Sequence, residues 1–447
     1  MEQYEAIVIG AGIAGLSVAG ILQTKGIKTL VIEKSKTPGG RAKTYEAPGG
    51  WRLDSGTHAM NLGLLSPANK ILKRLGGEIN WSRPIEGGMV FNEGKWMTFE
   101  ENMSLNGEDL KEYDSINDRI SRITDEEIAE QDTVPLSDWT RDNIANPRII
   151  EYFNNMGMVQ TTLAEAHLIS AGEFLHIYRN TINIGLEDQG MVRMPVGGIG
   201  AFTGALADRV KELGGTITFK QAVRRIKFGE NGIKTVVTDS GEYFTSTLVM
   251  AMPIWDLVKV LDMDEEDSPL PKEWRERMKS LVEETSSAIG FTLLLNKELF
   301  KKPVYLANWR IPGVNLPMQI FFPTNFDDTL APPGHMIAFI GACLTIEQVK
   351  DKKFCQEKLE AFWKACQEMF PGLEDTIIYR GDETTIGIDG LSRSPGLTGR
   401  YRPKVYMPEL PGLYFAGDCF TGRGVGMESA SNSAIICTEK ILEDLGK

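Results

Sequence analysis

Three glycines near the start of the chain have the spacing of a phosphate-binding turn. Gly10, Gly12 and Gly15 directly follow a short apolar run at residues 6–9. The run predicts a strand that is buried on both faces of a parallel sheet. In such a turn the first glycine permits the tight bend, the second lets a pyrophosphate approach the backbone, and the third lets a helix pack closely on the strand. The pattern therefore predicts a dinucleotide site at the amino terminus of a helix.

An acidic residue stands where the ribose of a bound dinucleotide would require one. A helix is expected from residue 16 to about residue 25, and a second buried strand at residues 29–32 ends on Glu33. A carboxylate about 20 residues beyond the glycine turn can accept hydrogen bonds from both ribose hydroxyls. Strand, turn, helix, strand and acid in this order suit NAD and FAD equally well.

Two further motifs distinguish between these cofactors. Residues 38–42 read Pro-Gly-Gly-Arg-Ala, and residues 53–58 read Leu-Asp-Ser-Gly-Thr-His. In these motifs the sequence resembles the flavoprotein group of monoamine oxidases, protoporphyrinogen oxidases and phytoene-desaturase-like enzymes. In that group the first turn wraps the FAD diphosphate and the second lies beside the flavin ring. The resemblance implies FAD as cofactor, and its contacts would include Gly40, Arg41, Gly56, Thr57 and His58, together with Ile13, Ala14 and Lys34.

The carboxyl-terminal part of the chain carries another motif of the same group. Residues 411–418 predict a strand that ends in Gly-Asp, and a helix is expected from about residue 428 to residue 445. The resemblance implies that the aspartate binds ribityl or diphosphate oxygens and that the helix start faces the N1/O2 edge of the flavin. That edge gains negative charge on reduction, which the positive end of a helix dipole stabilises. The implied contacts are Gly417, Asp418, Gly426 and Met427.

The middle of the chain predicts that the cofactor domain is discontinuous. Residues 194–200 open a helix that ends at the glycines 214–215, and a hairpin and a buried strand follow up to residue 251. In the resembling group this block belongs to the flavin domain, and the backbone at Val223 would hold the adenine. We expect an α/β fold with a Rossmann-like, glutathione-reductase-like FAD-binding domain (residues 1–80, 191–265 and 385–447), a mixed α+β substrate domain (81–105 and 266–384) and a helical subdomain (106–190).

Two helices are expected within the helical subdomain. One begins with Ser137 as its N-cap, and a longer one spans residues 164–182. In the resembling families such a subdomain roofs the substrate cavity or rests on a membrane. This segment lacks the basic polar face of an interfacial helix, which favours a packed cap.

Composition restricts the partners of the protein. The 447 residues carry a net charge of −13, which argues against nucleic acid and against a membrane surface reached by charge attraction. No apolar run reaches the roughly 18 residues of a membrane span. The five cysteines and four histidines are scattered, without metal-ligand spacing, so free thiols and no metal are expected. No signal-peptide pattern precedes the first strand. We therefore expect a cytoplasmic protein with at most peripheral membrane contact.

Candidates for a catalytic role are few. His58 follows the Asp-x-Gly turn and could face the flavin ring or make a structural hydrogen bond. Arg423 could contact flavin or substrate, or cap the glycine-rich loop. Cys419 does not have the spacing of the cysteine to which amine oxidases attach FAD, so non-covalent FAD is expected.

Two departures from the amine oxidases bear on the substrate. Phe291 occupies the position expected for their flavin-facing lysine, and Gly426 that of an aromatic cage residue. We therefore expect hydride transfer between flavin N5 and a carbon of a small apolar, unsaturated or cyclic substrate, as a desaturase or in reverse as a saturase. Oxygen, a quinone or a carrier would accept the electrons. The alternatives are a flavin amine oxidase and a non-catalytic protein resembling GDP-dissociation inhibitors. The latter is disfavoured because Glu33, Arg41 and Asp418 are retained.

Overall fold

Five parallel strands form the sheet that carries the glycine turn. The computed structural model describes residues 4–184, 187, 190–229, 232–261, 263–264, 268–314 and 316–447. The central strand β1 (Ala6–Ile9) lies between β2 (Thr29–Ile32) and β11 (Thr247–Met250). β7 (Thr216–Thr218) pairs with β2, and β17 (Leu413–Phe415) pairs with β11. Segments far apart in the sequence therefore meet in one sheet.

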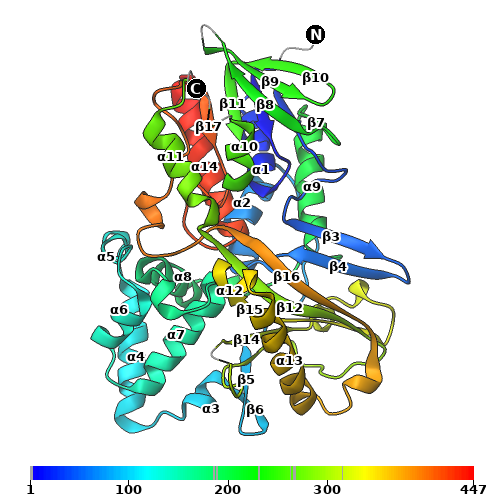
Figure 1. The fold of residues 1–447 in the computed structure, drawn as a ribbon, viewed down its shortest axis with the longest axis vertical. Helices are drawn as coiled ribbons and strands as arrows, with labels where there is room; N and C mark the ends of the chain where they lie inside the picture. The colour runs from blue at the N-terminus through cyan, green and yellow to red at the C-terminus, as the bar shows by residue number, and fades with distance from the viewer. Residues whose placement is uncertain are drawn as a thin grey trace.

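Helices cover this sheet and bury its central strands. Every residue of β1, β2 and β11 is buried, as the apolar runs predicted. α1 (Ile13–Thr24) packs against both α9 (Ile199–Glu212) and α14 (Met427–Asp444). Figure 1 shows this assembly at one end of the molecule, with both chain termini nearby. The α/β fold class with a parallel sheet is confirmed.

A second, seven-stranded sheet lies at the other end of the molecule. Its order is β16 (Ile377–Leu391), β12 (Thr285–Leu295), β15 (Met336–Leu344), β14 (Met318–Phe321), β13 (Tyr305–Asn308), β5 (Gly88–Asn92) and β6 (Lys95–Thr98). α13 (Lys352–Met369) covers one face, where Phe362 and Cys366 share a core with Leu293 and Ile340. The apolar stripe of this helix therefore belongs to the core.

The face of this sheet opposite α13 is less covered. Alternation along β15 places Phe339, Gly341 and Cys343 on that face, and cross-strand pairing adds Ala288 and Gly290 of β12. Phe339, Gly341 and Ala288 are only half-buried, whereas the residues between them are buried. This side is called the open face below.

Six helices form a layer with its own core, called the helical layer (residues 99–183). They are α3 (Phe99–Met103), α4 (Gly107–Arg122), α5 (Asp125–Glu130), α6 (Leu136–Asn143), α7 (Pro147–Thr161) and α8 (Ala171–Asn183). Two boundary predictions were wrong. Pro135, and not Ser137, occupies the N-cap of α6. The helix expected over residues 164–182 begins only at Ala171, because the hydroxyl of Ser170 caps it by accepting from Glu173 N at 3.3 Å.

The remaining elements complete the two halves of the molecule. β8 (Val223–Phe228), β9 (Lys234–Thr238) and β10 (Gly241–Thr245) form a small sheet, and β3 (Ala42–Ala47) pairs with β4 (Trp51–Gly56) in a hairpin that the sequence reading missed. The short helices are α2 (Pro67–Arg74), α10 (Ile254–Val260), α11 (Lys272–Ser280) and α12 (Ile346–Lys350). The predicted boundary at 384/385 falls inside β16, and the one at 265/266 lies outside the described residues. Within the described part of the chain, no helix has the length and apolar character needed to cross a bilayer.

Two helical glycines allow a matched test of the turn. A Cβ on Gly15 would lie 2.0 Å from the carbonyl oxygen of Gly10, whereas a Cβ on Gly204 of α9 would meet nothing within 4 Å. Gly15→Ala should therefore lower the free energy of unfolding by about 1–3 kcal/mol through overpacking and also reduce cofactor binding. Gly204→Ala should raise it by about 0.5–1 kcal/mol through helix propensity. Urea unfolding of both variants measures the difference, and equal effects would contradict the close packing of turn and helix.

Candidate functional site

The glycine turn between β1 and α1 packs directly on the Gly-Gly-Arg turn. Gly10 has a φ of +105°, and a Cβ there would lie 2.4 Å from Ala251 O on the neighbouring strand β11. Gly39 N donates to Ala11 O at 2.8 Å, which places the second turn beside Gly12. The two motifs thus expose backbone side by side at the carboxyl end of β1, where open α/β sheets bind nucleotides.

Glu33 lies at the carboxyl end of β2, beside the same turn. Its carboxylate accepts from Ala11 N and from Ser35 N, both at 2.8 Å, and the residue is 5% exposed. Gln221 N donates to Glu33 O at 3.0 Å and so brings the start of β8, with Val223, next to this loop. The acid and the residue expected near adenine are therefore neighbours.

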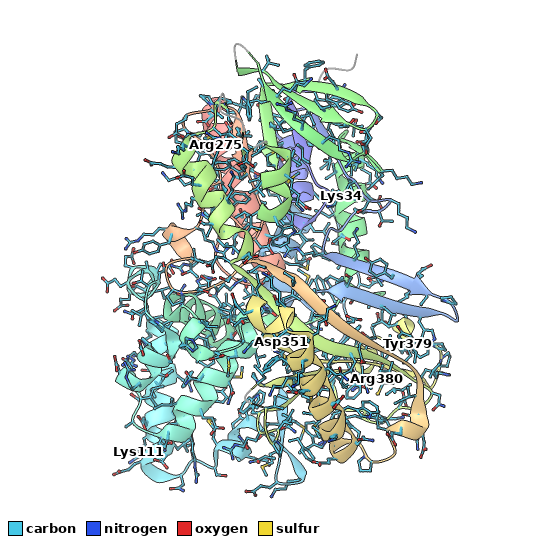
Figure 2. All side chains as sticks on the ribbon, viewed as in Figure 1. Lys34, Lys111, Arg275, Asp351, Tyr379 and Arg380 are labelled. Carbon is cyan, nitrogen blue, oxygen red and sulfur yellow. The ribbon has the colours of Figure 1, made fainter. Side chains whose placement is uncertain are left out.

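Lys34 lies apart from this group. Its Nζ forms an ion pair with Asp256 of α10 at 2.8 Å, and its side chain is 65% exposed. Figure 2 labels it at the surface.

An ion pair joins the first and last motifs of the chain. Arg41 Nη2 donates to Asp418 Oδ1 at 2.6 Å, and the Arg41 guanidinium lies 5.6 Å from the ring centre of Trp255. Burial opposes ionisation of Asp418, but the charge and the hydrogen bond of Arg41, together with the charge of Arg393, outweigh burial and lower the pKa of this carboxyl. Arg402, which is 2% exposed, donates to the backbone oxygen of Asp418. The second lone pairs of the Asp418 carboxylate remain available to ribityl hydroxyls or phosphate-bound groups.

His58 stacks on aromatic rings of the seven-stranded sheet at the end of the hairpin. Gly56 brings this turn against Arg41, because a Cβ on Gly56 would lie 2.5 Å from Arg41 O. The imidazole of His58 stacks on Phe339 of the open face, with ring centres 4.1 Å apart. Burial lowers the pKa of His58 to about 4, so the ring is neutral at physiological pH. Its Nδ1 has no hydrogen-bond partner among the described residues and lies 4.0 Å from Asp54 Oδ2.

The start of α14 is held by a carboxylate that the sequence did not single out. Gly426, with a φ of +54°, donates its N–H to Asp389 Oδ1 at 3.2 Å. Asp389 also pairs with Arg393, and both are almost fully buried. Thr162 Oγ1 lies 3.3 Å from Asp389 Oδ2. Thr162 has a φ of +58°, which is unusual for a β-branched residue. Such backbone strain persists where the surroundings over-determine it, commonly at functional sites.

Arg423 does not project from its loop as a free cation. Its guanidinium donates to Asp132 and to Glu173 at distances from 2.9 to 3.1 Å. This arrangement favours the structural role over direct contact with flavin or substrate.

The open face links these two ends of the site. His58 stacks on Phe339, and the negative charge of Asp389 contributes, after burial, to the raised pKa of Cys343. Phe339, Gly341 and Cys343 therefore lead from the hairpin to the start of α14, over about 13 Å of strand. Gly341 pairs with Gly290, so the middle of this face is bare backbone.

These residues fit a flavin dinucleotide. The exposed glycine backbone at the end of β1 and the carboxylate of Glu33 suit a pyrophosphate and a ribose. The amino terminus of α14 and the side-chain-free stretch at Gly341 suit a flat ring that gains negative charge. The orphaned Nδ1 of His58 gives a donor or acceptor to such a ring. Site residues that the sequence reading missed are Asp389, Arg393, Arg402 and Thr162, which stand in no recognisable motif.

The environment of Asp54 predicts a pH dependence of stability. Burial, and then the charge of Asp327, raise the pKa of Asp54 to about 6 despite hydrogen bonds from Thr44 and Ile199 N. Because folding raises this pKa, the group contributes stability that is fully present below the unfolded pKa of about 4 and lost as the pH rises through about 6. Asp54→Asn keeps the oxygen acceptor and does not titrate.

Between pH 5 and pH 7.5, the wild type should lose about 1.4 kcal/mol of unfolding free energy relative to Asp54→Asn. Urea unfolding at both pH values, with equal cofactor loading, gives this difference. Asp208→Asn, at an exposed position on α9, serves as the control and should show no such trend. A pH-independent gap between Asp54→Asn and wild type would contradict the raised pKa.

Comparison with known proteins extends these observations. The chain is 26% identical to prolycopene isomerase 1 of an Oncidium hybrid cultivar, across 100% of this chain and 85% of that protein. It is 27% identical to the lycopene-forming phytoene desaturase of Pantoea ananas, over 54% of each chain.

Solved structures show the same fold. An oxidoreductase from Methanosarcina mazei superposes with a TM-score of 0.80 at 21% identity, covering 97% of this chain and 99% of that one. Cyclohexylamine oxidase from Brevibacterium oxydans gives 0.66 at 16% identity, with both chains fully covered. Residues 13–442 match the sequence profile of the flavin containing amine oxidoreductases. The chain therefore belongs to the flavin-containing amine oxidoreductase family and is a flavin-dependent oxidoreductase.

Proposed function

We propose that this protein is an FAD-dependent oxidoreductase that moves a hydride between flavin N5 and a carbon of an apolar, unsaturated substrate. The observation that carries this proposal is the stretch of the open face along β15, which has no charged side chain. The nearest charge across the sheet is Glu383 of β16, which lies opposite Gly290. Between His58 and Asp389 the β15 stretch presents Phe339, Gly341 and Cys343, and burial raises the pKa of this thiol to about 12, which keeps it neutral. A site that positions an apolar chain in a dry cavity needs little help from ionised side chains.

The chemistry of a desaturation sets what the protein has to do. A bound flavin would supply a hydride acceptor for one substrate carbon, and the neighbouring carbon would pass a proton to the neutral His58 imidazole or to solvent as the double bond forms. The open face would hold both carbons and exclude water. The neutral His58 ring, fixed by Phe339 and Phe321, offers an uncharged polar atom beside them.

The structure gives the amine oxidase alternative little support. Phe291 does not reach the open face, because it is buried against α13, where its ring centre lies 5.7 Å from that of Trp363. Arg380, labelled in Figure 2, lies over the same ring. The site-facing neighbours of Phe291 are Gly290 and Thr292, and β12 contains no lysine.

A non-catalytic, inhibitor-like protein would have no need of the intact Glu33, Arg41 and Asp418 contacts.

The relatives suggest the substrate class. Their names include prolycopene isomerases and a phytoene desaturase, which favours a long polyene as the substrate of this chain. The likeness to the isomerases extends over the whole chain, so isomerisation of a polyene double bond without net oxidation is a second candidate.

A cavity beside the helical layer suits an elongated substrate. It has a volume of about 400 Å³ and lies between α7 and the β13–β14 connection. α7 ends next to Thr162, which contacts Asp389 at the start of α14, so the same helix borders both the cavity and the flavin site. Its apolar lining is Met158, Trp309, Ile311, Val314, Leu316 and Pro317, and the ion pair of Glu151 with Arg310 and the amide of Asn155 complete the wall.

Several finer features complete the proposal. Cys419 is buried, and its pKa of about 11 disfavours the thiolate, which supports non-covalent FAD. Oxygen, a quinone or a carrier would reoxidise the flavin. The negative net charge supports the absence of nucleic-acid partners and, at most, peripheral contact with a membrane. We also propose a cytoplasmic location. Separate apolar cores support the proposed division into cofactor, substrate and helical parts.

The first experiment is a spectrum of the purified protein. We expect an oxidised-flavin spectrum, with FAD released into the supernatant after acid precipitation. Anaerobic addition of a polyene in detergent should bleach the flavin and yield a more unsaturated product. A change of polyene geometry without bleaching would support the isomerase candidate. Bleaching by primary amines but not by polyenes would overturn the proposal in favour of the amine oxidase.

A second experiment tests the open face. Ala288→Phe adds a ring beside Gly341 and should lower kcat/KM at least tenfold by displacing the substrate, with unchanged FAD content. Thr384→Phe places the same ring at an exposed position of the adjacent strand β16 and should retain activity. Equal activity of the two variants would show that the substrate does not lie on this face.

A further inference from the structure

Arg423, whose side chain is 20% exposed, fastens the helical layer to the loop that leads into α14 through two buried carboxylates. Arg423 donates to both carboxylate oxygens of Asp132, at 3.0 and 2.9 Å, and to Glu173 at 3.1 Å. Asp132 is fully buried and Glu173 is 1% exposed. Water therefore cannot replace the guanidinium, and removal of one charge would leave an uncompensated partner in the interior.

The remaining lone pairs of the two carboxylates are also occupied. Gly424 N, in the loop itself, donates to Glu173 Oε1 at 2.6 Å. The hydroxyl of Thr398 donates to Asp132 Oδ1 at 3.2 Å. The helical layer thus holds the loop at two consecutive residues, one through a side chain and one through the backbone.

A second attachment lies at the other end of the same loop. Arg393 Nε donates to Gly424 O at 2.8 Å, and its guanidinium pairs with Asp389. Asp389 in turn accepts from Gly426 N, and Thr162 of the helical layer lies beside it. The loop at residues 422–426 therefore has contacts to the helical layer on both sides.

We propose that Asp132 and Glu173 are positioning residues for the flavin: through Arg423 and Gly424 they fix the loop at residues 422–426, and so aim the amino terminus of α14 at the flavin edge. The inference rests on the proposed placement of FAD at this helix. The helix dipole acts only over the first turn, so a displaced loop weakens its stabilisation of the reduced, negatively charged flavin. Reduction would then become less favourable.

The direction of the change in midpoint potential distinguishes a positioning role of Glu173 from a direct effect of its charge on the flavin. Glu173→Gln keeps the side-chain oxygen but removes one negative charge near α14. By charge alone, that loss would favour the reduced flavin and raise the midpoint potential. A loosened loop lowers the midpoint potential instead, because the helix dipole then stabilises the reduced flavin less. We expect a tenfold fall in the ratio of reduced to oxidised flavin at a fixed potential, which is about 30 mV for a two-electron couple.

Thr398→Val provides a variant without any charge change. It removes the hydrogen bonds of the Thr398 hydroxyl to Asp132 and to Ser170, which both belong to the helical layer. It should lower the midpoint potential as well, with a roughly threefold fall in the ratio of reduced to oxidised flavin. Asp118→Asn is the matched control, because Asp118 pairs with Arg122 at an exposed site of α4, elsewhere in the helical layer. It should leave the potential unchanged.

The measurement is dye-coupled reductive titration of FAD-loaded protein at pH 6. This pH lies below the pKa of about 8 that burial and the charge of Glu173 give to Glu428, the second residue of α14. Lower potentials for both Glu173→Gln and Thr398→Val support the proposal. An unchanged or raised potential in Glu173→Gln, or an unchanged one in Thr398→Val, overturns it. Wild type that cannot be loaded with FAD would refute the proposed function instead.

Discussion

The structure depends on the ion pair between Arg41 and Asp418, which are 377 positions apart in the chain. Arg41 is the last residue of the Gly-Gly-Arg turn, and Asp418 lies three residues beyond the end of β17, the strand at the sheet edge. Both lie where a nucleotide would cross the carboxyl ends of the strands. Because Asp418 is buried, its charge requires a cation, and the only geometry that supplies Arg41 closes the end of the chain onto its beginning. The glycine turns, Glu33 and α14 acquire their mutual positions from this closure.

Buried cations recur throughout the site, and each has a carboxylate or backbone oxygens as partners. Arg393 and Arg402 are among the largest fully buried side chains, and each is held by backbone oxygens as well as by a carboxylate or a neighbouring carbonyl. Such groups contribute little net stability, because desolvation offsets attraction, but they allow few alternative arrangements. The loop before α14 lies between these cations and the helical layer. Its shape is therefore determined by charge pairing more than by apolar packing.

The sequence predicted the parts of this site that rest on local backbone rules. The glycine turn, the buried parallel strands and the acid at Glu33 follow from periodicity and spacing, and the structure has each of them. Such local rules do not predict hydrogen bonds and ion pairs between residues that are far apart in the sequence. Nothing near Asp389 indicates that it would bind the N–H of Gly426, and nothing near Arg423 indicates two carboxylates from the helical layer. The predicted starts of α6 and α8 were wrong, because tertiary contacts as well as N-cap preference decide where a helix begins.

The parallel sheet has an implication for biosynthesis. β1 and β2 emerge from the ribosome first, but β17 pairs next to β11 and α14 packs on α1, and both come from residues 413–444. Until that segment is synthesised, the nascent chain presents the nucleotide turn beside an unpaired strand edge and an uncovered helix face. Cofactor capture must therefore wait until residues 413–444 have been synthesised and have folded onto the first strands.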